Sequence, residues 1–216
     1  MMKASNKLIE FKNIHLAFDG KRVIQNLSLK INKGDKVVIS GKSGSGKSSL
    51  LSLVLGFTRP DRGEVLFDGV PVDEKTVWSV RKKIAYIDQD VSLGAGIVQG
   101  LLDFLSGLKA NAHSVLKVNE LMEFFHLDID LLQKNVKELS GGERQRMAIV
   151  TAILLNRDVF FLDEVTSSLD KHLKKKVADY FLGREDSTCI IVSHDPVWLD
   201  NSVVRVFDFE EKKWRH

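Results

Sequence analysis

The chain has 216 residues, 44% of them hydrophobic and 28% charged, which fits one sizeable globular domain and excludes disordered, collagen-like and disulfide-stapled proteins. Its 32 Lys and Arg against 29 Asp and Glu leave a formal charge of +3, too small to indicate an anionic membrane, DNA or RNA, so we expect no nucleic-acid partner. The single cysteine, Cys189, can form no intramolecular disulfide, which favours an intracellular protein.

Neither the N-terminal segment nor any apolar run predicts membrane insertion. Residues Met1–Lys12 alternate polar and apolar side chains and lack the apolar core of about 7–15 residues that marks a secretory signal. The richest apolar run, Ala148–Leu155, is interrupted by Thr151 and falls short of the ~20 residues that cross a bilayer. We therefore expect a cytosolic protein that reaches a membrane only through a partner.

The N-terminal part predicts an antiparallel β layer. Strand patterns cover Leu8–Phe18, Val23–Ile31 and Gly63–Phe67. Turn-forming pairs such as Asp19-Gly20 and Asp68-Gly69 separate them, which is typical of antiparallel strands that follow one another along the chain.

A phosphate-binding loop follows a buried strand at Val37–Ile39. The sequence Gly41–Ser48 matches G-x-x-x-x-G-K-[ST] and continues into a helical pattern at Ser48–Leu55. Glycines let the backbone turn its N–H groups toward phosphate oxygens, and the helix N-terminus adds a partial positive charge. We expect Lys47 to reach the β- and γ-phosphates and the Ser48 hydroxyl to bind Mg²⁺. The predicted phosphate-binding residues are Gly41, Lys42, Ser43, Gly44, Ser45, Gly46, Lys47, Ser48 and Ser49.

From about Asp90 to Glu138 the strand signals stop. Apolar residues recur there at helical spacing, between loops that contain glycine. They are Val115, Val118, Met122 and Phe125. The pattern predicts a small helical insertion.

The next helix has two glycines in its first turn. Ser140 is placed as the N-cap and Glu143 completes a capping box ahead of the helical pattern Arg144–Leu155. The box accounts for the helix start but not for Gly141 and Gly142, each of which costs up to about 1 kcal/mol relative to alanine. Exposed N–H groups, the Ser140 hydroxyl and the helix dipole would form a second anion site, which suggests two chains around one nucleotide.

Two further apolar runs, Val159–Leu162 and Ile190–Val192, predict strands buried on both faces, as in a parallel sheet. Asp163 and Glu164 end the first of them, at the edge where open α/β folds bind ligands. We expect Asp163 to hold Mg²⁺, directly or through its water, and Glu164 to polarise the attacking water as general base. The alternation of such strands with helices predicts an α/β fold with a mostly parallel sheet beside the antiparallel layer.

Together these motifs resemble the nucleotide-binding subunit of ATP-binding cassette (ABC) transporters. A Walker A loop at Gly41–Ser48, an L-S-G-G-E-R-Q-R signature at Leu139–Arg146 and a Walker B strand at Val159–Glu164 occur in the family order. The signature is the specific element, because many P-loop proteins share the other two. The resemblance covers essentially the whole chain and implies a P-loop core with an α-helical subdomain. The implied bounds are 1–89 and 139–216 for the core with its β subdomain, and 90–138 for the helical subdomain.

The resemblance also implies roles for residues that the motifs above do not mark. Gln89 resembles the Q-loop glutamine that would contact Mg²⁺ and the attacking water, and His194 resembles the switch histidine that contacts the γ-phosphate. Ser167–Asp170 is similar to the D-loop that crosses the dimer interface, and Phe18 stands where the family has an aromatic ring stacked on adenine. The implied catalytic residues are Glu164, His194, Gln89 and Lys47. The other histidines show no ligand spacing and are assigned to no metal: His15, His113, His126, His172 and His216.

In the implied assembly, ATP lies between the Walker A loop of one subunit and Ser140–Gly142 of another, in a homodimer or heterodimer on the cytosolic face of the cell membrane, and drives a separate transmembrane permease. Two alternatives remain open at this stage. One is a soluble ABC ATPase of iron–sulfur assembly, translation or DNA repair. The other is a P-loop kinase or GTPase with an accidental signature, which would leave Gln89 and His194 unexplained.

Overall fold

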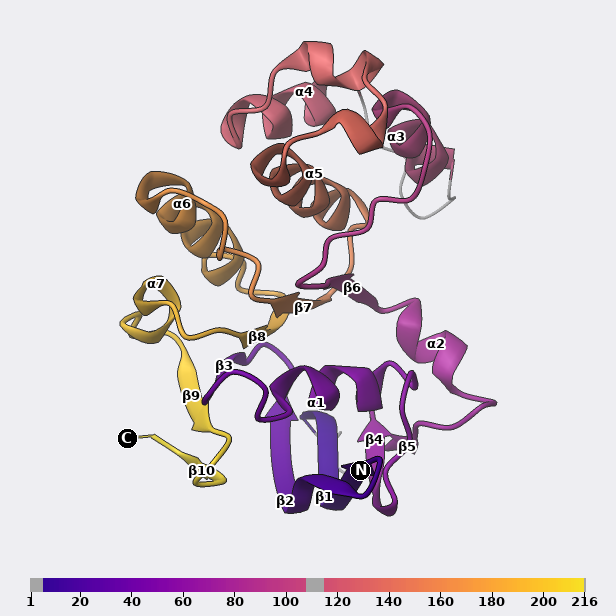
Figure 1. Cartoon of the computed structure of the whole chain (residues 1–216), viewed down its shortest axis with the longest axis vertical. Coiled ribbons are helices and arrows are strands. Elements are labelled where there is room, and N and C mark those ends of the chain that lie inside the picture. The colour runs from indigo at the N-terminus through magenta and orange to yellow at the C-terminus, as the bar shows by residue number, and fades with distance from the viewer. Residues whose placement is uncertain (1–5, 108–114, 216) are drawn as a thin grey trace.

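A six-stranded sheet forms the centre of the molecule (Figure 1). The computed structural model describes residues 6–107 and 115–215; His113, His216 and the side chain of Val115 lie outside this part. The strand order is β10 (Lys213–Trp214), β9 (Arg205–Asp208), β3 (Lys36–Ser40), β8 (Thr188–Val192), β7 (Val159–Asp163) and β6 (Ile84–Ile87). Strands β9 to β6 are parallel, and only the pairing of β10 with β9 is antiparallel.

A second, antiparallel sheet comes from the N-terminal part of the chain. Its order is β2 (Lys21–Asn32), β1 (Lys7–Phe18), β4 (Arg62–Phe67) and β5 (Val70–Pro71). Helix α1 (Lys47–Val54) packs between this sheet and the central one, because its Leu50, Leu51 and Val54 share one buried cluster with residues of both. The predicted antiparallel layer is confirmed.

The remaining helices lie mainly around the opposite face of the central sheet (Figure 1). They are α2 (Val77–Arg81), α3 (Val98–Gly107), α4 (Val115–Phe124), α5 (Gly141–Leu154), α6 (Lys171–Leu182) and α7 (Pro196–Leu199), with short 3-10 helices at Ile129–Gln133 and Val136–Glu138. No helix within the described ranges combines the length and apolar composition that a membrane span requires.

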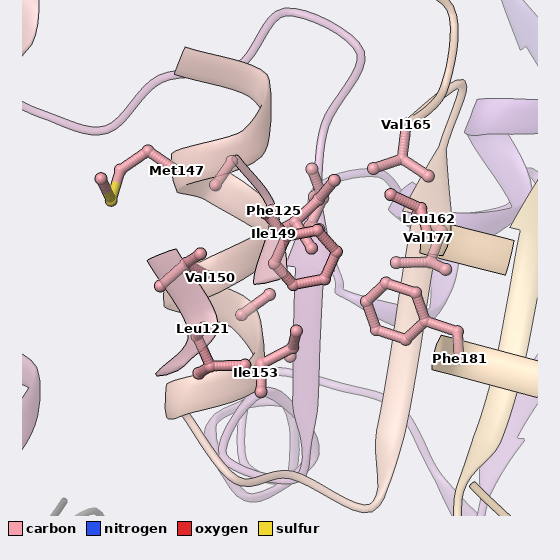
Figure 2. Close-up of a cluster of buried hydrophobic side chains, with 14 of the residues drawn as sticks. Leu121, Phe125, Met147, Ile149, Val150, Ile153, Leu162, Val165, Val177 and Phe181 are labelled. Carbon is pink, nitrogen blue, oxygen red and sulfur yellow. The ribbon is translucent and has the colours of Figure 1, made fainter. Parts of the chain in front are cut away.

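Strand β7 is buried on both faces, as the sequence predicts. Phe160 and Leu162 belong to the cluster on one side of the sheet, and Val159 and Phe161 to the cluster on the other side. Alternation along a strand produces this division, since successive side chains point to opposite faces. Figure 2 shows the first cluster, where side chains of α5 and α6 meet β7, with Phe125 beside them. The buried strand thereby fixes the position of the two carboxylates at its end.

The predicted helical insertion contains α3, α4 and the two 3-10 helices between β6 and α5. Val118, Met122 and Phe125 are buried, as their spacing predicts. One isolated bridge between Ile97 and Asn135 joins the two ends of this segment. The assignment of residues 90–138 as a subdomain of its own stays a prediction.

Candidate nucleotide-binding site

A pocket of about 690 Å³ opens where β3 and β7 end, at the edge of the sheet that the motifs mark. It is lined by Phe18, Val23, Gly41, Lys42, Ser43, Gly44, Gly46, Lys47, Ser48, Ser49, Gln89, Asp163, Glu164, Ser167, Val192 and His194. The structure therefore brings residues from five separate stretches of the sequence to one place. Of the predicted site residues, Ser45 and the segment Ser140–Gly142 do not line this pocket.

The loop between β3 and α1 depends on glycine at Gly46. Its φ is 105°, in the region that side chains rarely adopt, and a Cβ there would lie 2.3 Å from Val23 Cγ1. Gly46 is also the N-cap of α1 and leaves the first N–H groups of the helix without a side-chain acceptor. N–H groups at such a helix start, together with the helix dipole, favour an anion there.

Lys47 lies within its own loop. Its Nζ donates to the carbonyl oxygens of Gly41, at 2.9 Å, and Lys42, at 2.7 Å, and the residue is 7% exposed. Among the described residues the ammonium group forms no ion pair, and neutral carbonyls hold it at the pocket. A phosphate can outcompete these carbonyls because it carries charge.

Asp163 is buried at the end of β7, and neither of its carboxylate oxygens has a hydrogen-bond partner among the described residues. Burial raises the pKa of this carboxyl to about 6, because an ionised carboxylate loses its hydration there. Ser48 and Asp163 both line the pocket. The Ser48 hydroxyl lowers the pKa of Asp163 against the effect of burial, so the two groups lie close together. A buried carboxylate beside a hydroxyl is a donor set that suits a hard divalent cation such as Mg²⁺.

Glu164 has an unusual backbone conformation for its residue type, with φ at 47°. Its N–H donates to Val192 O at 2.9 Å, which ties the ends of β7 and β8 together. Its Oε1 lies 3.1 Å from Nδ1 of His194, whose side chain is 81% exposed. The strained backbone presents one carboxylate to the pocket and to the histidine, and strain of this kind is common at functional sites.

Gln89 and Phe18 also line the pocket. The backbone N–H of Gln89 donates to Asp88 Oδ1 at 2.8 Å, which fixes the start of the loop after β6. Phe18 ends β1 and is 45% exposed, so its ring is available to a planar ligand.

The start of α5 has the capping box that the sequence predicts. Glu143 N donates to Ser140 Oγ at 3.3 Å, and Ser140 N donates to Glu143 Oε2 at 2.8 Å. The bonds between these residues lower the pKa of Glu143. A Cβ added at Gly141 would meet nothing within 4 Å, and one at Gly142 only Nη1 of Arg146 at 3.6 Å. Packing among the residues that the structure describes therefore does not require glycine at either position.

One residue with a structural link to the site was not singled out from the sequence. Gln145, 5% exposed on α5, donates from Nε2 to Val165 O at 2.7 Å and accepts from Ser168 Oγ at 2.6 Å. It thus joins the helix of the signature to the loop that carries Ser167. A polar residue in register with the buried Ala148 and Ile149 is the signal that could have identified it.

The structure also bears on the GTPase alternative. Asn32-Lys33-Gly34-Asp35 has the N-K-x-D pattern of guanine-reading proteins, but it forms the turn before β3, whereas the phosphate-binding loop follows β3. There Asn32 N and Arg205 Nη1 both donate to Asp35 Oδ2. This tetrapeptide lies at the wrong end of the strand to read a base in the pocket.

Solved structures share the fold. A bacterial Atm1-family ABC exporter with ATP bound superposes with a TM-score of 0.84 at 22% identity, covering 100% of this chain and 39% of that chain. CbiO1 from Clostridium perfringens, part of the ABC transporter complex cbiONQ, gives 0.75 at 24% identity, covering 98% of this chain and 88% of that one.

Curated relatives add sequence identity. The energy-coupling factor transporter ATP-binding protein EcfA1 of Oceanobacillus iheyensis is 30% identical over 200 residues, which are 88% of this chain and 71% of that protein. The ATP-dependent lipid A-core flippase of Haemophilus influenzae is 30% identical over 204 residues, 90% of this chain but only 35% of the flippase. A family model described as "ABC transporter" matches residues 24–167. By this match and by the identity to EcfA1, the chain belongs to the ABC transporter family, as an ATP-binding domain that hydrolyses ATP to drive transport.

Proposed function

We propose that this chain is the motor subunit of a membrane transporter: two ATPase subunits close around ATP and drive a transmembrane permease carried by another chain. The name of EcfA1 describes an ATP-binding protein of a transporter. This chain covers 71% of EcfA1 but only 35% of the flippase. The second ATPase subunit is another copy of this chain or a related one, and the complex lies on the cytosolic face of the cell membrane.

The glycine pair at the start of α5 carries the proposal of a dimer. Gly141 and Gly142 leave space for a Cβ among the described residues, so packing does not explain why they are glycine. Neither residue lines the ATP pocket of its own chain. Glycine in a helix costs up to about 1 kcal/mol relative to alanine, so a close approach from outside the chain explains both residues. In the proposed dimer, Ser140 and these N–H groups cap the γ-phosphate held by the other subunit.

The loop and the end of β7 hold the substrate. Backbone N–H groups of Gly41–Ser49 cradle the phosphates, and Lys47 moves from its carbonyl partners to the β- and γ-phosphates. Ser48 and Asp163 would hold Mg²⁺, with Gln89 as a further ligand. When bound, the metal neutralises charge that develops on the phosphate oxygens. Phe18 stacks on the adenine ring without selecting it by hydrogen bonds.

Hydrolysis requires a base and a group that senses the γ-phosphate. Glu164 accepts a proton from the attacking water, and Gln89 helps to orient that water. His194, whose Nδ1 lies 3.1 Å from Glu164 Oε1, contacts the γ-phosphate and keeps the carboxylate aimed at the water. Loss of the γ-phosphate removes the contact between the two subunits, so the dimer opens.

A groove beside the site fits the permease. It has a volume of about 330 Å³ and is lined by residues of β6, the loop after it and α5, including Tyr86, Val91, Leu93 and Thr151. Phe57 at its edge is 61% exposed. An amphipathic helix of the permease would place its apolar face here, next to Gln89, and so couple to the proposed helical subdomain at 90–138.

The dimer is tested with Glu164→Gln, which keeps the shape of the side chain and removes the base. We expect ATP binding to persist, turnover to fall by at least 100-fold, and ATP to convert the monomer into a stable dimer on size-exclusion chromatography. The same protein with ADP is the control and should remain monomeric. A variant that binds ATP yet stays monomeric, alone and with related ATPase subunits present, would contradict the composite site.

A further inference from the structure

The phosphate-binding loop rests on a part of the chain that the family match at residues 24–167 does not include. Strand β9 runs parallel to β3, with Asp208 paired to Ser40. Phe209 N then donates to Ser40 O at 2.9 Å. The turn that follows β9 therefore leaves the sheet directly beside the first residue of the loop, Gly41.

One buried side chain lies beside both ends of the loop. Phe209 is 5% exposed. A Cβ at Gly41 would lie 3.4 Å from Phe209 Cβ, and a Cβ at Gly46 would lie 3.6 Å from Phe209 Cζ. A methyl group at either glycine would just touch Phe209, so this side chain lies beside both the entry and the exit of the loop.

The next residue holds the backbone of the loop. Lys42 N donates to Glu210 Oε1 at 3.0 Å, and Lys42 Nζ lies 3.6 Å from Glu210 Oε2. Glu210 does not line the nucleotide pocket, so it acts on the loop from the outer side. An ionised acceptor makes a stronger bond to a backbone N–H than a neutral one does.

The turn that carries Glu210 is itself held in place. Asp208 Oδ1 accepts from the N–H groups of Glu210, at 3.1 Å, and Glu211, at 3.0 Å, and its Oδ2 accepts from Arg215 Nη2 at 2.8 Å. Lys212 Nζ donates to Gln25 O at 2.6 Å, which fixes the far side of the turn to β2. Glu210 is thus presented to the loop by a preformed turn.

We propose that Phe209 and Glu210 form a brace that holds the phosphate-binding loop in its binding conformation, and that Glu210 is a positioning residue which sets ATP affinity without touching ATP. A loop ordered in advance loses less conformational entropy when its N–H groups close on phosphate. The proposal rests on ATP binding by the loop and not on the dimer, so it can fail while the proposed function stands.

The test compares three variants of the full chain by titration with a fluorescent ATP analogue and competition by ATP. Glu210→Ala removes both contacts to Lys42 and is expected to raise Kd about five-fold, which corresponds to about 1 kcal/mol. Glu210→Gln keeps an acceptor for Lys42 N–H and should stay within about two-fold of the wild type. Glu211→Ala is the matched control, with the same loss of charge in the same turn, and should bind as the wild type does.

Two further readouts separate positioning from folding. The kcat of Glu210→Ala at saturating ATP should stay close to that of the wild type while KM rises, because the reacting groups are unchanged. The nucleotide-free Tm values of the two alanine variants should agree. The brace is overturned if Glu210→Ala binds ATP as tightly as Glu211→Ala, if Glu210→Gln loses as much affinity as Glu210→Ala, or if the loss comes with a lower Tm in Glu210→Ala alone.

Discussion

At the scale of single residues, Lys47 carries the clearest expectation. Lys47 is 7% exposed, its ammonium group donates to the Gly41 and Lys42 carbonyls, and it forms no ion pair among the described residues. Lys47→Ala should lower ATP affinity at least tenfold, since a hydrogen bond to a charged group is worth about 1.5–3 kcal/mol. The measurement is the same ATP titration, with the exposed Lys137→Ala as control. Unaltered ATP affinity in Lys47→Ala would contradict the assignment of the loop.

The site residues that the sequence identifies belong to local motifs, whereas those it misses act through contacts between distant parts of the chain. The loop Gly41–Ser48 can be recognised because its geometry is local: glycines, a lysine and a helix start at fixed spacing. Gln145 acts through hydrogen bonds to Val165 and Ser168. Glu210 acts through Lys42, which lies 168 residues earlier in the sequence. Contacts of this kind arise from tertiary packing and leave no local pattern, so only the fold shows them.

At the scale of elements, the first turn of α5 separates the needs of folding from those of function. Gly141→Ala places a methyl group where the chain itself has open space, so it should stabilise the free protein by about 0.4–1 kcal/mol. The same methyl group would obstruct the close approach of a second subunit. In the Glu164→Gln background we therefore expect Tm to rise while ATP-dependent dimerisation weakens at least tenfold.

Gly100→Ala is the matched control for this prediction. Gly100 lies in α3, and a Cβ there also meets nothing within 4 Å. Its replacement should raise Tm in the same way and leave the dimer unchanged. If Gly141→Ala dimerises as well as Gly100→Ala does, the glycine pair is not an interface and the dimer must be built differently.

Several of the elements missed in the sequence have a weak or mixed pattern, although helix α6 was missed despite buried residues at helical spacing. Strand β9 is largely half-exposed and β10 spans only Lys213–Trp214, so neither shows a buried run. Helix α2 covers only Val77–Arg81. Every residue of strands β3, β7 and β8 is buried. Buried strands are rich in β-branched and aromatic side chains, and these continuous apolar runs predicted the three strands.

At the scale of the whole molecule, the two sheets are tied by packing and by charge. Helix α1 fills the space between them, and both faces of the central sheet are covered, as expected for a parallel sheet. Asp68, in the turn between β4 and β5, pairs with Lys33 before β3 at 2.6 Å and with Lys83 before β6 at 3.0 Å. The Asp68 carboxylate thereby joins the antiparallel sheet to the residues that precede β3 and β6 of the central sheet.

This bridge gives the fold a defined response to acid. Partial burial raises the pKa of Asp68, but the bonds from Lys33 and Lys83 outweigh it and leave the pKa below its ordinary value. A carboxyl whose pKa is lower in the folded than in the unfolded chain stabilises the fold above the unfolded pKa, ~3.9, and this contribution disappears as pH falls through the folded pKa.

Asp68→Asn should thus lower Tm at pH 7 by about 1–3 °C. A partly exposed ion pair contributes up to about 1 kcal/mol, and each kcal/mol shifts Tm by about 2–4 °C. Once the pH lies well below the folded pKa of Asp68, the two proteins should unfold together. Asp19→Asn, in the exposed turn between β1 and β2, is the control and should follow the wild type at every pH. A Tm difference for Asp68→Asn that persists undiminished into strong acid would show that shape at position 68, and not charge, joins the two sheets.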